Sequence, residues 1–202
     1  MAAVKRLSEA ERKKEIMDSA TKVIAKKGLG KATMKDIIAG TTLSKGGVYH
    51  YYGNVIEIFR DIMISGIEYR NNIIKEHLIE CEKGGESRFM AKQLVEKIID
   101  ENPLMSLYVE FLIEKKRNLE LNNIMEELQE QTKERFNEVM SDDSGWLFDL
   151  ENFQFITDLI NAFILASDIL EARENFKKNR HYLELMFIYV FEQMKGESDG
   201  SL

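Results

Sequence analysis

The sequence predicts an all-α protein of about nine helices, with a small N-terminal three-helix domain followed by a larger helical domain. Two observations carry this prediction. The 202 residues include a single proline, whereas the helix-favouring Glu, Lys, Leu, Ile and Met are frequent. Apolar residues recur at spacings of three and four along most of the chain, and no pair of segments has the turn chemistry of a β-hairpin. We expect the domains to span residues 1–53 and 54–195, and residues 196–202 to form a disordered tail.

The first three helices are expected to form a compact N-terminal domain. The first runs over residues 8–27, where apolar side chains recur at helical spacing, and Gly28 ends it. Thr33 precedes the short helix MKDIIA as its N-cap, and Ser44 does the same for the helix KGGVYHYY. Residues 40–43, GTTL, interrupt the pattern between them. Two short helices joined by a tight turn make a helix-turn-helix between Thr33 and Tyr52.

Six further helices are expected in the larger domain. Asn54 begins a long one that continues to about Glu80, and the CEKGGES loop follows it. The last two helices are apolar on nearly all sides, which requires burial on more than one face. They could supply the interior of one chain or pair with the same helices of a second copy. The helices after the first loop are expected over residues 87–101, 103–118, 121–140, 152–170 and 182–194.

Charge is distributed unevenly along the chain. The net charge of -7 argues against nucleic acid as a partner, because a phosphate backbone attracts Lys and Arg. Residues 1–60, however, hold 12 Lys and Arg against 6 Asp and Glu, while residues 61–202 hold 16 against 29. A basic N-terminal quarter on an acidic remainder favours a domain that faces nucleic acid. From the charges alone, a chance run of solvated lysines stays open as an alternative.

Several other classes of protein are disfavoured by the sequence. The lone Cys81 excludes an intramolecular disulfide and fits a reducing compartment. No apolar run of 18 residues offers a membrane span, and the charged N-terminus lacks a signal peptide, so we expect a cytoplasmic protein with no membrane partner. The histidines, His50, His77 and His181, lie far apart, and no catalytic motif is present. We therefore expect no enzyme activity, metal or cofactor.

The residue string of the helix-turn-helix is more specific than its helix pattern. Residues 26–59, KKGLGKATMKDIIAGTTLSKGGVYHYYGNVIEIF, contain a KxG link, an AT pair at the second helix, an S-K-G helix start, an aromatic string and a closing E-x-F. This stretch resembles the N-terminal DNA-binding domain of the TetR family of bacterial transcriptional regulators. The resemblance covers about the first quarter of the chain. It implies that residues 1–53 bind DNA and that residues 54–195 bind an effector and dimerise.

The same resemblance implies specific contacts with a double-stranded operator. Thr33 is expected to touch a phosphate, and the first turn of the third helix to hold the DNA backbone closely. The implied DNA-binding residues are Thr33, Ser44, Lys45, Gly46, Gly47, Tyr49 and His50. Val48, Tyr52 and Phe59 are expected to form the core of the domain. Family members commonly have glycine in the turn where this chain has Thr42, so Gly40 is expected to absorb the bend instead.

The larger domain is expected to bind a small-molecule effector and a second copy of the chain. The alternative for each candidate residue is ordinary core packing, and a protein partner could replace the small molecule. The net charge of residues 61–202 mildly favours a neutral or cationic effector. The effector-pocket candidates are Tyr69, Met90, Tyr108, Phe111, Met125, Phe136 and Trp146, with Asn72, His77 and Asn161 as polar candidates. The dimer candidates are Phe153, Ile156, Ile160, Phe163, Tyr182, Met186 and Tyr189.

Overall fold

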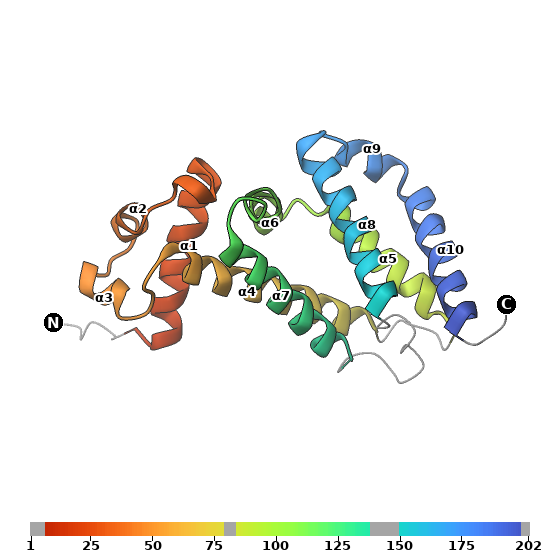
Figure 1. Cartoon of the computed structure of the whole chain (residues 1–202), viewed down its shortest axis with the longest axis horizontal. Coiled ribbons are helices and arrows are strands. Elements are labelled where there is room, and N and C mark those ends of the chain that lie inside the picture. Colours follow the sequence, from red (N-terminus) through yellow and green to blue (C-terminus); the bar gives the residue numbers. More distant parts are fainter. Residues whose placement is uncertain (1–6, 79–83, 138–149, 199–202) are drawn as a thin grey trace. The chain divides into compact units, whose positions relative to one another are not determined.

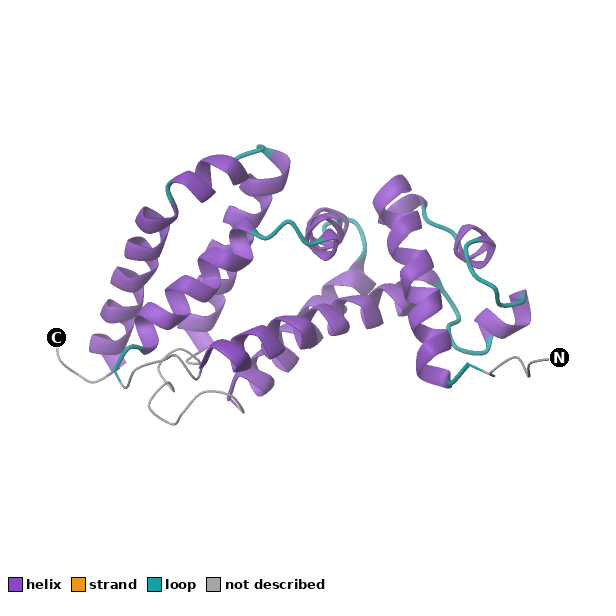
Figure 2. Cartoon of the chain, turned by 180° about the vertical axis from the view of Figure 1, so that it is seen from behind, coloured by secondary structure: helices purple, strands orange, loops and turns teal. Residues whose placement is uncertain are grey.

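The computed structural model describes residues 7–78, 84–137 and 150–198. Those residues form ten α-helices and one 3-10 turn and contain no strand, which confirms the all-α class (Figure 2). The helices are α1 (Glu9–Lys27), α2 (Met34–Ala39), α3 (Lys45–Tyr49), α4 (Val55–Leu78), α5 (Glu86–Ile99), α6 (Pro103–Glu114), α7 (Leu119–Asn137), α8 (Leu150–Ile169), α9 (Arg173–Lys178) and α10 (Arg180–Ser198), and the 3-10 turn is Leu29–Lys31. The short α9 was not expected from the sequence. Its sequence, RENFKK, has Phe176 as its one apolar residue and therefore shows no apolar stripe.

The chain divides into two compact units. The head unit comprises residues 1–67 and 106–128, and the body unit comprises residues 68–105 and 129–202. The boundaries therefore fall inside α4, α6 and α7, each of which contributes residues to both units. The boundary between separate domains at residue 53 stays a prediction.

The core of the head unit joins α1, α2 and α3 to the start of α4. Val48, Tyr52 and Phe59 are buried, as the sequence predicts. Phe59 also meets Phe111 of α6, with ring centroids 5.5 Å apart, so α6 shares this core. Other buried members from the first two helices are Ile16, Ala20, Ile24 and Ile37. The inner face of α3 therefore packs against the apolar core of the head unit.

The turn between α2 and α3 differs from the expectation for Gly40. Gly40 has φ -93°, and Thr42 is not among the residues with positive φ, so neither uses the left-handed region. The prediction that Gly40 absorbs the bend through glycine's extra freedom is wrong. Glycine is needed there for close packing, because a Cβ would lie 2.3 Å from Ser19 Oγ. That hydroxyl donates a buried hydrogen bond to the Ile37 carbonyl at 2.7 Å and ties α1 to α2.

The body unit is built around α5, which packs against both α8 and α10 (Figure 1). Phe187 and Phe191 of α10 are fully buried, with ring centroids 6.3 Å apart. The chain turns between α8 and α9 at Glu171, which has φ 55°. The core side chains of α5 are Met90, Ala91, Val95, Ile98 and Ile99, and those of α8 are Ile156, Ile160 and Ile164. This packing holds α5 between two helices that come much later in the sequence.

Candidate nucleic-acid interface

Side-chain caps fix the starts of α2 and α3. Thr33 Oγ1 accepts a hydrogen bond from the Asp36 N–H at 3.2 Å and donates one to Asp36 Oδ2 at 2.7 Å. Ser44 Oγ accepts a hydrogen bond from the Gly47 N–H at 3.1 Å. Each hydroxyl satisfies a backbone donor that the first turn of a helix leaves without a partner. The two caps therefore set the directions of both short helices.

Asp36 also connects α2 to the end of α1. Its Oδ1 accepts a hydrogen bond from Lys27 Nζ at 2.7 Å. This ammonium and the Thr33 hydroxyl together lower the pKa of Asp36. The carboxylate therefore stays charged, and the hydrogen of the Thr33 hydroxyl is directed at it. Thr33 sits at the expected position, with its hydroxyl occupied by the cap.

The two faces of α3 have different roles. Val48 is completely buried, and Tyr52 follows one turn later with 4% of its surface exposed. On the other side, Lys45 and Tyr49 are one turn apart and exposed, and the Lys45 ammonium lies 5.8 Å from the Tyr49 ring centroid. His50 is exposed beside them. Packing on one face thus orients a cation, a phenol and an imidazole on the other.

Gly46 and Gly47 leave part of the α3 surface without side chains. A Cβ at Gly46 would have nothing within 4 Å, so the space beside this residue is open. A Cβ at Gly47 would lie 3.4 Å from Ser44 Oγ, in ordinary contact with the cap. The backbone at Gly46 can therefore be approached closely by a large molecule.

Tyr52 is held by a polar contact as well as by burial. Its hydroxyl donates a hydrogen bond to Asp61 Oδ2 at 2.9 Å, which joins the residue after α3 to α4. Burial, reinforced by the Asp61 carboxylate, raises the pKa of Tyr52. The tyrosine stays neutral, and α3 is anchored to the long helix that leads into the body unit.

Two of the three basic residues in the first half of α1 pair within that helix. Lys14 pairs with Asp18 at 3.0 Å, and Lys13 lies 3.8 Å from Glu9. Arg12 donates to the Leu7 carbonyl. The local excess of positive charge near this end of α1 is therefore smaller than the residue types suggest.

The effector candidates from the sequence are divided between the two units. Met90 is buried in the body unit, and Tyr69 is half exposed there. Phe111 and Met125 are buried in the head unit, where Tyr108 is half-buried with its ring 6.1 Å from that of Phe111. The side chain of Phe136 and the whole of Trp146 lie outside the described residues. Of the polar candidates, Asn72 is exposed and Asn161 is half-buried.

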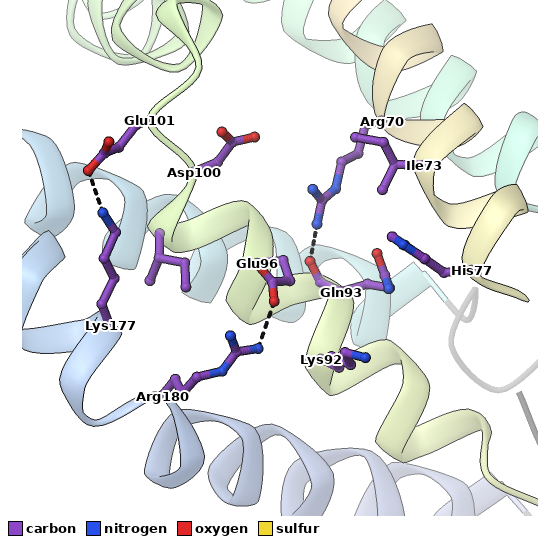
Figure 3. A pocket seen from close by; sticks show the side chains of 11 residues that line it. Arg70, Ile73, His77, Lys92, Gln93, Glu96, Asp100, Glu101, Lys177 and Arg180 are labelled. Carbon is purple, nitrogen blue, oxygen red and sulfur yellow. Dashed lines mark hydrogen bonds and ion pairs between the residues drawn. The ribbon is translucent and has the colours of Figure 1, made fainter. Parts of the chain in front are cut away.

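A pocket of about 810 Å³ lies within the body unit (Figure 3). Among the sequence-based candidates that the structure describes, His77 alone lies in its wall. Two ion pairs cross the wall: Arg180 binds Glu96 at 2.7 Å, and Lys177 binds Glu101. The lining residues are Arg70, Ile73 and His77 of α4, Lys92, Gln93, Glu96 and Ile99 of α5, Asp100 and Glu101 after it, Lys177 of α9 and Arg180 of α10.

Sequence reasoning missed this wall because it searched for aromatic and sulfur-bearing residues. A usable signal was present in α5, where Gln93 falls among buried apolar residues. Burying an amide is costly unless it is hydrogen-bonded, so an amide within an apolar stripe marks a position where a polar partner is needed. The spacing of Arg70, Ile73 and His77 also puts them on one face of α4.

The apolar dimer candidates fall into buried and exposed groups. Ile156 and Ile160 are buried within the chain, whereas Tyr182 and Tyr189 are 63% and 67% exposed. Phe153, Phe163 and Met186 are half-buried. Further exposed apolar side chains on or beside α8 and α10 are Phe155, Ile169, Leu170 and Leu185.

None of the described helices is long and apolar enough to cross a membrane.

Comparison with known proteins gives matches at the level of both sequence and structure. The family model for bacterial regulatory proteins of the tetR family matches residues 16–62. An uncharacterized HTH-type transcriptional regulator, YfiR of Bacillus subtilis, is 28% identical over 138 residues, which span 64% of this chain and 64% of the relative. Salmonella enterica GusR superposes with a TM-score of 0.72 at 16% identity, over 92% of this chain and 98% of that one. A structure described as a TetR-family transcriptional regulator of Mesorhizobium loti superposes with a TM-score of 0.56 at 18% identity. That match covers 94% of this chain and 97% of the other.

Proposed function

Because this chain is a transcriptional regulator of the TetR family with an N-terminal DNA-binding domain, we propose that it binds a palindromic operator as a dimer and is released by a small-molecule effector. The main support for this proposal is that α3 is buried on one face and exposed on the other. Val48 fixes one face in the core while Lys45 and Tyr49 are presented on the other. In a helix-turn-helix, the second helix enters the major groove in this orientation.

The proposed interface holds the DNA backbone more than it reads bases. Gly46 and Gly47 offer no side chains to base edges, and Ser44 is occupied as a cap. The exposed donors of Lys45, Tyr49 and His50 remain for phosphates and a few bases. Sequence preference then depends partly on the shape of the DNA and on the spacing of two half-sites.

Exposed apolar residues on α8 and α10 support the proposal of a dimer. Tyr182, Leu185 and Tyr189 recur at spacings of three and four, so they share one face of α10, and Phe155 is exposed on α8. Large apolar side chains that cluster on a surface favour a protein partner. Regulators of this family act as dimers, so a second copy is the partner that we propose.

The pocket supports a small molecule as the signal. A volume of about 810 Å³ is within the range of small-molecule sites. The chain also offers a direct connection, because only Asn102 separates Asp100 and Glu101 of the pocket wall from the start of α6. Further along α6, Glu110 Oε2 accepts a hydrogen bond from the Leu29 N–H at 3.4 Å, within the head unit. A shift of α6 on effector binding would disturb this contact and change the geometry of the two recognition helices.

The proposed function can be tested with duplexes from the region upstream of the protein's own coding sequence. Lys45→Ala should weaken binding to a palindromic duplex by roughly ten-fold or more, because a hydrogen bond to a charged phosphate contributes about 1.5–3 kcal/mol. Lys178→Ala removes the same charge from an exposed position of the body unit and serves as the matched control. Equal affinities for the two variants, measured by fluorescence anisotropy, would remove α3 from the interface.

A further inference from the structure

The guanidinium of Arg70 is unusually placed for a partly buried cation. It reaches from α4 to α5, where Nη2 donates to the backbone carbonyl of Gln93 (Figure 3). No ion pair joins it to a carboxylate anywhere in the described part of the chain. A guanidinium has five N–H donors in a planar fork, so one carbonyl leaves most of them available. Burial lowers the pKa of Arg70, although the nearby charges of Asp100 and Glu96 act in the opposite direction.

The acidic residues of the same pocket are already engaged. Glu96 pairs with Arg180 at 2.7 Å, and Glu101 pairs with Lys177. Asp100 Oδ1 accepts a hydrogen bond from the Asn102 N–H at 2.9 Å. Asp100 and Glu96 act on Arg70 only at longer range. A backbone N–H does not neutralise Asp100, so its charge remains. The lining side chains together hold four Lys and Arg against three Asp and Glu, which is a formal excess of one positive charge.

A buried acceptor lies in the same wall. Gln93 is only 3% exposed, and its side-chain Oε1 has no hydrogen-bond partner among the described residues. A buried polar atom without a partner costs about 1–3 kcal/mol, and such atoms are rare in folded proteins. A ligand hydroxyl or amine that donates to Oε1 would remove this cost.

The rest of the wall favours a hydrophilic ligand. Of the eleven lining side chains, only Ile73 and Ile99 are apolar. Next to the wall, burial and the charge of Arg70 lower the pKa of Lys97 to about 8. An anion bound near Arg70 would raise the pKa of Lys97 again, because an opposite charge favours the charged form of a group.

We propose that this pocket binds a small hydrophilic carboxylate, with the carboxylate on the guanidinium of Arg70 and a hydroxyl donating to Gln93 Oε1. Arg binds a carboxylate with two parallel hydrogen bonds, which fits the free side of the fork. The overall acidity of residues 61–202 favours a neutral or cationic ligand, whereas this pocket favours an anionic one. The charges that line the pocket act on a ligand more strongly than distant charges, which the solvent screens. The assignment of this ligand as the effector rests on the proposed function, whereas its binding does not.

Three probes of nearly equal size separate the effect of charge from that of shape. Gluconate, sorbitol and glucamine share a six-carbon hydroxylated chain and are anionic, neutral and cationic near pH 7. Each is titrated to 20 mM into the full chain while the side-chain Nε–Hε resonance of Arg70 is followed by NMR. We expect gluconate to bind and shift that resonance, and sorbitol and glucamine to bind at least about ten-fold more weakly.

Variants of the pocket test the two assigned groups. Arg70→Gln should weaken gluconate binding roughly ten- to hundred-fold, and Arg70→Lys, which keeps the charge and the fold, should restore part of it. Arg88→Gln removes an exposed arginine of α5 and should change nothing. Gln93→Met should raise the melting temperature of the free protein and still weaken gluconate binding. A packing role alone would not move these two readouts in opposite directions.

The outcomes distinguish this proposal from the proposed function. No shift of the Arg70 resonance with gluconate, or equal binding of sorbitol or glucamine, overturns the carboxylate site. Equal gluconate affinity of Arg70→Gln and Arg88→Gln overturns it as well. If gluconate binds at Arg70 but the chain does not bind operator DNA, the site stands and the regulatory role fails. If operator binding persists without any response at Arg70, the regulatory role stands and the site fails.

Discussion

Replacing Gly46 with alanine separates the stability of α3 from its contact with DNA. A Cβ at Gly46 meets no atom within 4 Å, and the residue lies inside α3, so alanine fits without a clash. Alanine favours helix over glycine by about 0.8–1 kcal/mol, and a five-residue helix should realise about half of this or more. For a chain of this length, the melting temperature should therefore rise by roughly 1–4 °C.

The same substitution should weaken operator binding, because a methyl group would then stand where the DNA backbone approaches. Losing one charge-assisted hydrogen bond of about 1.5 kcal/mol in each of the two half-sites costs about 3 kcal/mol in all, which weakens binding by roughly a hundred-fold. Gly196→Ala is the matched control, since Gly196 is another helical glycine, in α10 of the body unit, with nothing within 4 Å. Calorimetry and fluorescence anisotropy are measured on both variants. If Gly46→Ala is more stable and binds DNA as tightly as the unchanged chain, no backbone approaches Gly46 and the reasoning fails.

Three further predictions concern stability. Tyr52→Phe removes the 2.9 Å hydrogen bond to Asp61 and should lower the free energy of unfolding, measured in urea, by about 1–2 kcal/mol. Tyr51→Phe is the control, and equal stabilities of the two variants would contradict a stabilising role for this hydrogen bond. Gly40→Ala should destabilise the chain by about 1–3 kcal/mol, because its Cβ would lie 2.3 Å from Ser19 Oγ. The loss of stability should be smaller in a Ser19→Ala background, and an equal loss in both backgrounds would contradict a clash with Ser19. Burial and Arg70 lower the pKa of Lys97 to about 8, below its unfolded value, so the unfolded chain holds more protons between about pH 8 and 10.5. The stability of the unchanged chain relative to Lys97→Met should therefore rise with pH across that window, and a difference that stays constant from pH 7 to 10 would refute the shift.

The helix-turn-helix could be predicted because its determinants are local. Thr33 and Ser44 cap helices that begin at the next residue, and their partners, Asp36 and Gly47, lie three residues away. The spacing of Val48 and Tyr52 likewise predicts a shared buried face. The role of Gly40 could not be derived this way, because it depends on Ser19, which is distant in sequence and reaches Gly40 only through the packing of α1 on α2.

The pocket depends on contacts between residues that are far apart in sequence. Arg70 and Gln93 come from different helices, and Glu96 meets Arg180 across 84 positions. Nothing in the sequence near Arg70 shows that its guanidinium lacks a carboxylate, because that follows from how Glu96 and Glu101 are paired elsewhere. Helical periodicity predicts which face of a helix is buried but not which helices meet.

The salt dependence of operator binding tests the central claim most directly. The full chain is titrated onto a palindromic duplex and onto a scrambled duplex of equal length, at several salt concentrations, with stoichiometry measured by sedimentation. We expect two chains for each palindromic duplex and a log affinity that falls by about 0.9 per log salt for each phosphate neutralised, so about six phosphates give a slope near -5. A flat salt response, or equal affinity for the scrambled duplex, would contradict the assignment of Lys45, Tyr49 and His50 to an operator-binding surface.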